Sequence, residues 1–151
     1  MIGVFRRDDL PAFESRPVAL SLWRVADPGN VGTLIRTADA FGASVELSEG
    51  CADPTGPKAL RASVGALFRV PLGEAKGRRL GLVPHAGRGL DEVELGEGTI
   101  FVLGSERGGL STEMEGICDE LVTIPTPGPA ESLNVAAAGA VALYEWSRRA
   151  D

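Results

Sequence analysis

Short apolar segments that alternate with amphipathic segments constrain the fold of this 151-residue chain more than any other feature. Residues 18–23 and Thr99–Leu103 have the length and apolar character of buried strands. Residues 31–41 place apolar side chains at helical spacing, with Asn30 suited to the N-cap and Gly42 to the position after the helix. Strands that alternate with helices predict an α/β domain with a mainly parallel sheet flanked by helices.

The remaining segments continue this alternation. We expect strands at residues 44–47, 80–83 and 121–124, and helices at residues 57–66, 111–119 and 132–149. No repeat and no linker divides the chain, so residues 1–151 are expected to form one domain. The last helix carries no charge from Ser132 to Tyr144, which indicates burial on most sides without excluding a dimer contact. Gly139 within it suggests that another backbone passes close by.

The composition argues against several classes of protein. Residues 1–9 contain no apolar run of signal-peptide length, so we expect no N-terminal targeting segment, and the longest apolar run, residues 135–144, is about half the length of a membrane span. We therefore expect a cytoplasmic protein without a membrane partner. Cys51 and Cys118 lie far apart, with only His85 to join them, so we expect no disulfide and no metal site. His85 is assigned no role.

The charge is distributed unevenly along the chain. The net charge is −6, which argues against a nucleic-acid partner. The stretch 58–90 nevertheless carries seven basic residues and a single acidic one, Glu74. This stretch is either a phosphate-contacting region or an ordinary solvated surface, and its composition alone does not decide between the two. The basic residues are Lys58, Arg61, Arg69, Lys76, Arg78, Arg79 and Arg88.

Three loop segments could carry chemistry, and the first is residues 27–36. Asn30 and Gly32 lie where a strand gives way to a helix, and a helix N-terminus offers free N–H groups to an anion. Arg36 shares a face with Gly32 and points away from the apolar stripe, towards a surface that Gly32 would open to a ligand or partner. The alternative is a capped helix with a solvated arginine.

The second segment is the glycine-rich turn within residues 101–111, which follows a strand and precedes a helix. Ligands bind beyond the carboxyl ends of strands in open α/β sheets. The turn is neither GxGxxG, because Glu106 stands where a second glycine belongs, nor a Walker A loop. Glu106 also disfavours a polyphosphate ligand by its charge.

The third segment, residues 124–135, joins a strand to the last helix. Its prolines stiffen the loop, which suits a preorganised pocket wall. Ser132 and Asn134 offer a hydroxyl and an amide at the start of the helix. The alternative is a simple connector with a serine N-cap.

Together these segments resemble the SpoU/TrmH family of RNA ribose 2′-O-methyltransferases, within the SPOUT superfamily. That family has three motifs in this order: Asn-x-Gly-x-x-x-Arg, a strand followed by Gly-x-Glu-x-x-Gly, and Ile-Pro followed by Ser-Leu-Asn-Val and a small-residue helix ending in Tyr-Glu. The resemblance covers residues 18–149. The matching residues are Asn30, Gly32 and Arg36, then Gly104, Glu106 and Gly109, then Ile124, Pro125, Ser132, Leu133, Asn134, Val135, Tyr144 and Glu145.

The resemblance implies a SPOUT fold with a deep C-terminal trefoil knot, a homodimer, and S-adenosylmethionine (SAM) as cofactor. It places the catalytic function on Arg36, with Asn30, Glu106, Ser132 and Asn134 around it. A knot is rare among folds, and periodicity alone predicts an unknotted chain. The residues implied in SAM binding are Leu103, Gly104, Ser105, Glu106, Gly109, Ile124, Pro125, Ser132, Leu133 and Asn134.

The substrate implied is a ribose 2′-hydroxyl of tRNA or rRNA. Only some 17 residues precede the first strand, whereas many relatives carry an N-terminal RNA-binding domain. RNA recognition is then expected from the dimer itself or from a partner, with Arg61, Lys76, Arg78 and Arg79 as tentative phosphate contacts. The alternatives are a non-catalytic SPOUT-like protein that binds RNA or SAM, and a nucleotide-binding α/β domain unrelated to RNA.

Overall fold

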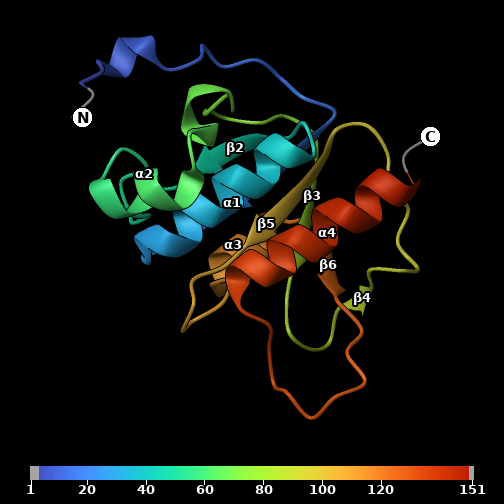
Figure 1. Ribbon diagram of the computed structural model, residues 1–151. Helices are drawn as coiled ribbons and strands as arrows, with labels where there is room; N and C mark the ends of the chain where they lie inside the picture. Colours follow the sequence, from blue (N-terminus) through green and yellow to red (C-terminus); the bar gives the residue numbers. More distant parts are fainter. Residues whose placement is uncertain (1–3, 150–151) are drawn as a thin grey trace.

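The computed structural model describes residues 4–149, which are built around a six-stranded parallel sheet (Figure 1). The strand order is β2-β1-β5-β3-β6-β4, and every strand pairing is parallel. The expected mainly parallel sheet is therefore confirmed. The strands are β1 (Val18–Leu22), β2 (Ser44–Leu47), β3 (Arg78–Leu82), β4 (Arg88–Gly89), β5 (Thr99–Leu103) and β6 (Glu120–Thr123).

Helices cover both faces of the sheet. In Figure 1 the helices α1 and α4 lie side by side over one face, where they pack with alternate residues of the central strands such as Phe101 and Leu103. Ile100 and Val102 point to the other face, where they pack with Met114 of α3. The helices are α1 (Pro28–Ala40), α2 (Pro57–Ser63), α3 (Thr112–Ile117) and α4 (Val135–Arg149), with short 3-10 helices η1 (Arg7–Asp9) and η2 (Ala66–Phe68). No helix within residues 4–149 is long and apolar enough to cross a membrane.

Several helix ends differ from the predicted ones. The N-cap of α1 is Asp27, whose carboxylate accepts a hydrogen bond from the Asn30 backbone at 2.9 Å, so Asn30 lies inside the helix. Helix α2 stops at Ser63 because the following residue, Val64, is left-handed, with a φ of +50°. Helix α4 starts at Val135, and the amide of Asn134 accepts hydrogen bonds from its first turn. The two-residue strand β4 was not expected, because a pair of residues has no periodicity.

Gly32 does not face a ligand, contrary to the sequence-based expectation. It is buried where α1 crosses α2, and a Cβ atom added there would overlap the Ala59 carbonyl oxygen and lie 2.7 Å from the Cβ of Ala62. The glycine therefore allows two helices of the same chain to pack closely. Gly139 of α4 also has an internal role, but it accommodates the side chain of Leu34 and not another backbone.

The carboxyl end of β6 is enclosed by the chain that joins β3 to β4. β6 lies between these two strands, and residues 83–87 cross from one to the other. The Val83 N–H donates to the Val122 carbonyl at 2.9 Å, and the Gly87 N–H donates to Thr123 Oγ1 at 3.0 Å. The helices before and after β6, α3 and α4, pack on opposite faces of the sheet.

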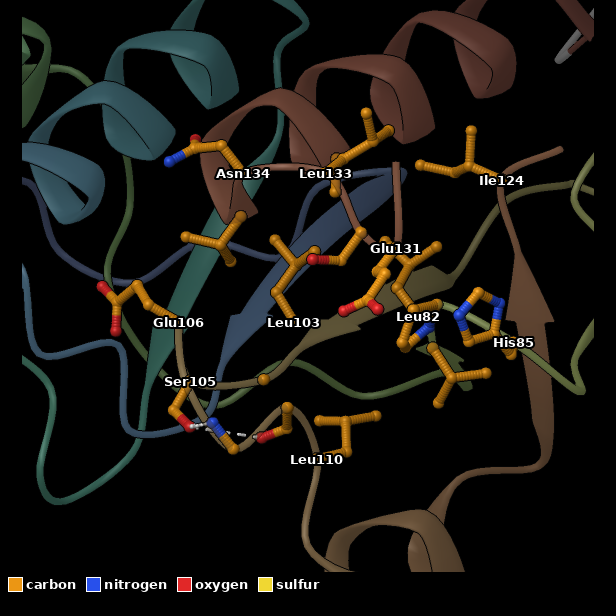
Figure 2. A pocket seen from close by; sticks show the side chains of 18 of the residues that line it. Leu82, His85, Leu103, Ser105, Glu106, Leu110, Ile124, Glu131, Leu133 and Asn134 are labelled. Carbon is orange, nitrogen blue, oxygen red and sulfur yellow. Dashed lines mark hydrogen bonds between the residues drawn. The ribbon is translucent and has the colours of Figure 1, made fainter. Parts of the chain in front are cut away.

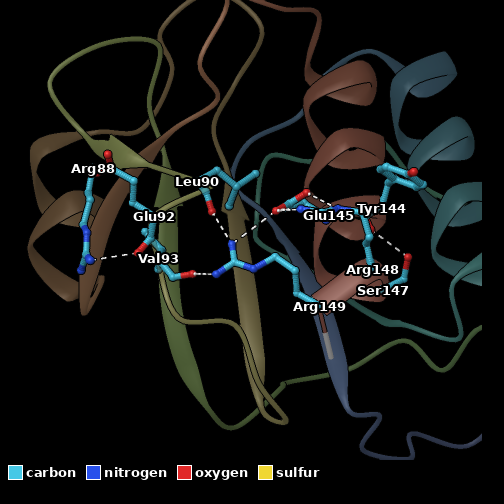
Figure 3. Close-up of polar contacts among 9 residues, drawn as sticks. All are labelled: Arg88, Leu90, Glu92, Val93, Tyr144, Glu145, Ser147, Arg148 and Arg149. Carbon is cyan, nitrogen blue, oxygen red and sulfur yellow. Dashed lines mark hydrogen bonds and ion pairs between the residues drawn. The ribbon is translucent and has the colours of Figure 1, made fainter. Parts of the chain in front are cut away.

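Arg149 fastens the end of α4 to the segment that follows β4 (Figure 3). Its guanidinium donates to the Leu90 carbonyl at 3.0 Å and to the Val93 carbonyl at 2.5 Å, and it also pairs with Glu145. Trp146 adds a hydrogen bond from its indole N–H to the Gly96 carbonyl at 3.0 Å. Carbonyl oxygens that lie outside the sheet ladder thus find charged or polar donors on α4.

We expect Gly32→Ala to lower the free energy of unfolding by about 2–3 kcal/mol, because the methyl group forces α1 away from α2. Gly116→Ala is the matched control, since a Cβ atom there would meet nothing within 4 Å and alanine favours the α3 helix. Urea denaturation measures both. Equal stability of the two variants would contradict the close helix packing.

We expect Arg149→Met to lower the free energy of unfolding by about 1–3 kcal/mol, because two carbonyl groups lose a charged donor. Arg148→Met is the control: its side chain is 57% exposed, against 25% for Arg149, and its ion pair is with Glu145 alone. Thermal and urea unfolding should show little change in the control. The same loss in both variants would show that helix propensity or net charge is responsible.

Candidate functional site

A cavity of about 710 Å³ opens at the carboxyl ends of β3, β5 and β6 (Figure 2). This edge of a parallel sheet is where α/β proteins bind ligands, and the volume is that of a small-molecule site. Three chain segments form its walls: residues 82–86 after β3, residues 103–110 after β5, and residues around the β6–α4 loop. Apolar side chains such as Leu82, Leu103 and Leu133 alternate with polar ones from the loops.

The structure brings together almost all of the residues expected to bind the cofactor. Pro125 is not among the lining residues, although Ile124 and Thr126 on either side of it are. Ser132 and Asn134 line the cavity together with residues of the loop after β5. The expected residues that line the cavity are Leu103, Gly104, Ser105, Glu106, Gly109, Ile124, Ser132, Leu133 and Asn134.

One wall was missed by the sequence analysis. Residues Leu82 to Ala86, including His85, line the cavity from the end of β3, and Figure 2 shows His85 near Leu82. Glu131 was also missed, and its carboxylate lies in the middle of the same view. Pairing of β3 directly with β5 places this wall, and that strand order is not encoded in any local pattern. The one sequence signal that could have predicted this wall was the position of His85, just beyond a predicted strand.

The glycines of the second motif close a tight turn. The Ser105 and Gly109 backbones exchange hydrogen bonds in both directions, each at 3.0 Å, and Gly109 is left-handed with a φ of +61°. A Cβ atom on Gly104 would overlap the backbone of Gly109. Both positions therefore require glycine, Gly104 for close approach and Gly109 for its conformation. The turn sets the direction of the residues between them, including Glu106.

Glu106 joins the three motifs through its carboxylate. It accepts hydrogen bonds from the backbone N–H groups of Ala26 (3.2 Å) and Asp27 (2.9 Å), and from the side-chain amide of Asn30 (3.2 Å). Asn30 in turn accepts from the side-chain amide of Asn134 at 3.3 Å. The loop after β5, the start of α1 and the start of α4 are thus held together by charged and neutral hydrogen bonds.

These donors determine the protonation state of Glu106. Burial raises the pKa of the carboxyl group, but the hydrogen bonds from the Asp27 and Glu106 backbones, the Asn30 side chain and the Ala26 backbone outweigh it. The net effect lowers the pKa of Glu106 below its ordinary value of 4.5. Glu106 is therefore an anion at neutral pH and acts here as an acceptor rather than as a general acid.

Arg36 lies apart from the cavity. It is exposed on α1, six residues beyond Asn30, which places it about 9 Å farther along the helix axis. The expectation that it points away from the core is confirmed. It is not among the residues that line the cavity, so the cavity walls and Arg36 do not form one site within this chain.

The basic stretch is mostly neutralised by neighbouring carboxylates. Arg78 and Arg79, which precede the strand expected at residues 80–83, form the start of β3 at the edge of the sheet opposite the cavity. Arg78 pairs with Glu120, and the half-buried Arg79 pairs with Glu46 at 3.1 Å. Arg61 and Lys76 are exposed and have no ion pair among the residues described.

Residues 17–144 match the model of the SpoU rRNA Methylase family. A curated relative from Streptomyces viridochromogenes, named 23S rRNA (uridine(2479)-2′-O)-methyltransferase, is 37% identical over 145 residues, which are 83% of this chain and 50% of the relative. The chain spans about half the length of the curated relatives it matches.

Two solved structures show the same fold. A protein of the TrmH family from Porphyromonas gingivalis superposes with a TM-score of 0.83 and 39% identity, covering 93% of this chain and 63% of that one. The SpoU methyltransferase AviRb from Streptomyces viridochromogenes, in complex with the cofactor AdoMet, superposes with a TM-score of 0.80 and 30% identity, covering 95% of this chain and 64% of that one.

We expect Glu106→Gln to lower the free energy of unfolding at neutral pH by about 1 kcal/mol, a modest figure because the side chain is exposed. The variant carries an NH₂ group where the carboxylate accepts hydrogen bonds. The folded-state pKa of Glu106 is lowered, so its stabilisation is complete above the ordinary glutamate pKa and is lost as pH falls through the folded-state value.

The difference between wild type and Glu106→Gln should therefore shrink in urea denaturation at about pH 3.5 compared with pH 7. Glu97→Gln is the control, because the side chain of Glu97 is exposed and makes no ion pair within residues 4–149. A stability difference that is independent of pH would show that the Glu106 charge is not what holds the motifs together.

Proposed function

The chain belongs to the SpoU rRNA Methylase family, and on that premise we propose that it transfers a methyl group from SAM to a ribose 2′-hydroxyl of RNA. One observation carries the proposal: the second and third motifs line a single cavity, and hydrogen bonds of Asn30 with Glu106 and Asn134 join the start of the first motif to them. Disconnected motifs on a merely similar fold would have no reason to converge there.

The cavity suits SAM in size and in chemistry. The apolar side chains of Leu82, Leu103 and Leu133 offer a surface to a purine ring, and the glycine turn offers backbone donors and acceptors to the ribose and amino-acid groups. The carboxylates of Glu106 and Glu131 suit a ligand that carries a sulfonium and an ammonium group. When bound, SAM supplies the electrophilic methyl group, and these residues hold it in place.

Arg36 is proposed to position the substrate. Its guanidinium stays protonated near neutral pH, which makes it a poor base for a ribose hydroxyl. Its forked donors suit a phosphate or ribose oxygen, and alignment of the 2′-oxygen can by itself supply several kcal/mol. Asn30, at the start of the same helix, would orient the ribose from the side of the cavity.

A homodimer would bring Arg36 to a cavity, because Arg36 does not line the cavity of its own chain. Helix α4 supports this arrangement through two exposed apolar side chains three residues apart. Val141 is 39% exposed and Tyr144 is 59% exposed. Apolar side chains that gather on one helix face typically mark a protein–protein contact. We propose that this face lies at the dimer seam.

The C-terminal trefoil knot is also proposed here. β6 passes between β3 and β4, which residues 83–87 connect across its carboxyl end. Since α3 and α4 lie on opposite faces, the chain crosses the sheet within the ring formed by β3, residues 83–98 and β5. This geometry supports a threaded chain. The β6–α4 loop, which forms the third wall of the cavity, is the segment that emerges from the ring.

The test is methylation of bulk tRNA and bulk rRNA with isotope-labelled SAM, followed by analysis of the nucleosides for 2′-O-methylation. Calorimetric titration with SAM, NAD and ATP is run in parallel. Tight NAD or ATP binding without SAM binding would overturn the proposal and favour a nucleotide-binding domain. SAM and RNA binding without turnover would favour the non-catalytic alternative.

We expect Arg36→Ala to reduce methyl transfer by about 100-fold or more, because the substrate oxygen loses its alignment. SAM affinity should stay close to that of the wild type, since Arg36 does not line the cavity. Arg7→Ala, an exposed arginine on η1, is the control. Single-turnover methylation and calorimetry measure the two effects, and wild-type turnover in Arg36→Ala would remove its assigned role.

A further inference from the structure

Trp23 and Arg24 lie at the carboxyl end of β1, directly beside the cavity. The Trp23 N–H donates to the carbonyl of Leu103, a cavity residue, at 2.8 Å. Three residues later, the Ala26 N–H donates to Glu106. The Trp23–Arg24 pair therefore lies between the loop after β5 and the start of α1. Neither side chain is among those that line the cavity, and neither residue belongs to the three motifs.

Arg24 has an unusual backbone conformation. Its φ is +52°, in the left-handed region that favours glycine, although it carries one of the longest side chains. The conformation is held from two sides. The Arg24 N–H donates to Ser48 Oγ at 2.9 Å, and the side chain passes so close to Gly50 that an added Cβ would lie 3.2 Å from Arg24 Cγ. Glycine would be the less strained choice, so the Arg24 side chain is present here at a cost in backbone strain.

The guanidinium of Arg24 lies over the ring of Trp23. The guanidinium carbon of Arg24 lies 5.2 Å from the centroid of the half-buried Trp23 ring, within the range of a cation–π contact. Arg24 is exposed, and no carboxylate pairs with it among residues 4–149. The same holds for Arg107, which lines the cavity from the neighbouring turn.

This arrangement contrasts with the basic stretch 58–90, where carboxylates neutralise five of the seven cations: Lys58, Arg69, Arg78, Arg79 and Arg88. An exposed guanidinium beside an aromatic ring is a surface on which proteins stack unpaired bases of RNA, and a second free guanidinium suits the adjoining phosphate. In an acidic protein, unneutralised cations beside the reaction site direct an RNA there more effectively than paired ones elsewhere.

We propose that Trp23 and Arg24 form a stacking platform for a nucleobase of the RNA substrate next to the methylated ribose, and that Arg107 binds the neighbouring phosphate. This inference rests on the proposed RNA methyltransferase function and adds to it the surface that holds the substrate. It moves RNA recognition from the amino edge of the sheet, where Arg78 and Arg79 lie, to the edge that bears the cavity.

Arg24→Gly separates a binding role from a structural one. Glycine relieves the left-handed backbone, so the melting temperature should stay the same or rise. RNA affinity should fall by about 5-fold or more, as expected for loss of one stacked base, and the slope of log affinity against log salt should decrease by about 1. SAM affinity should not change. Lys76→Gln, which removes an exposed cation far from the cavity, should leave RNA affinity within about 2-fold.

A spectroscopic measurement gives an independent readout. The chain has two tryptophans, so Trp146→Phe leaves Trp23 as the only one. Titration of this variant with bulk rRNA or bulk tRNA should quench its fluorescence, and the added change Arg24→Gly should weaken the quenching. Anisotropy with the same labelled RNAs gives the affinities, and calorimetry gives the binding of SAM.

The outcomes are distinct. Unchanged RNA affinity in Arg24→Gly, or an effect equal to that of Lys76→Gln, would overturn the platform even if the wild type methylates RNA. Lack of RNA methylation by the wild type would instead overturn the proposed function. Loss of RNA affinity together with a lower melting temperature in Arg24→Gly would also count against the platform, because it would point to a structural role for Arg24.

Discussion

The Glu106 carboxylate is the interaction on which the site depends. Three segments that are far apart in sequence reach the same edge of the sheet, and each would leave backbone or amide groups without partners if it stood alone. One anion accepts from the start of α1 at both Ala26 and Asp27, and it also accepts from Asn30, which contacts Asn134 at the start of α4. These contacts lower the pKa of Glu106, because each donor favours the ionised form. The glycine turn that presents Glu106 is therefore as important as the carboxylate itself.

Much of the fold could be predicted because β1 and β5 are apolar on both faces, as central strands of a parallel sheet must be. The strand order could not be predicted, since no local pattern tells β3 to pair with both β5 and β6. The cavity wall at residues 82–86 was missed for the same reason. The motif residues were found through a resemblance, and their physical roles differ from the local interpretation. Gly32 serves helix packing, and Arg78 and Arg79 are neutralised by carboxylates rather than free for phosphate.

The distribution of charge becomes informative only when each cation is matched with its neighbours. Counting residues along the chain singles out the stretch 58–90, yet most of its guanidinium and ammonium groups have carboxylate partners in the folded protein. Exposed arginines without such partners, Arg24, Arg36 and Arg107 among them, carry more of the positive potential that an approaching anion would meet. A protein with a net charge of −6 can in this way present a local attraction to nucleic acid.

The position of β6 between β3 and β4 has a consequence for the order in which the protein can be assembled. The ribosome makes residues 88–89 before residues 120–123, yet β4 pairs only with β6 among the strands described. The sheet from β2 to β3 can therefore form on the growing chain, while the segment that becomes β4 must wait as an open loop. The gap between β3 and β4 has to stay unfilled until the later strand enters it. The last wall of the cavity follows β6, so the cavity is complete only when β6 has been inserted between β3 and β4.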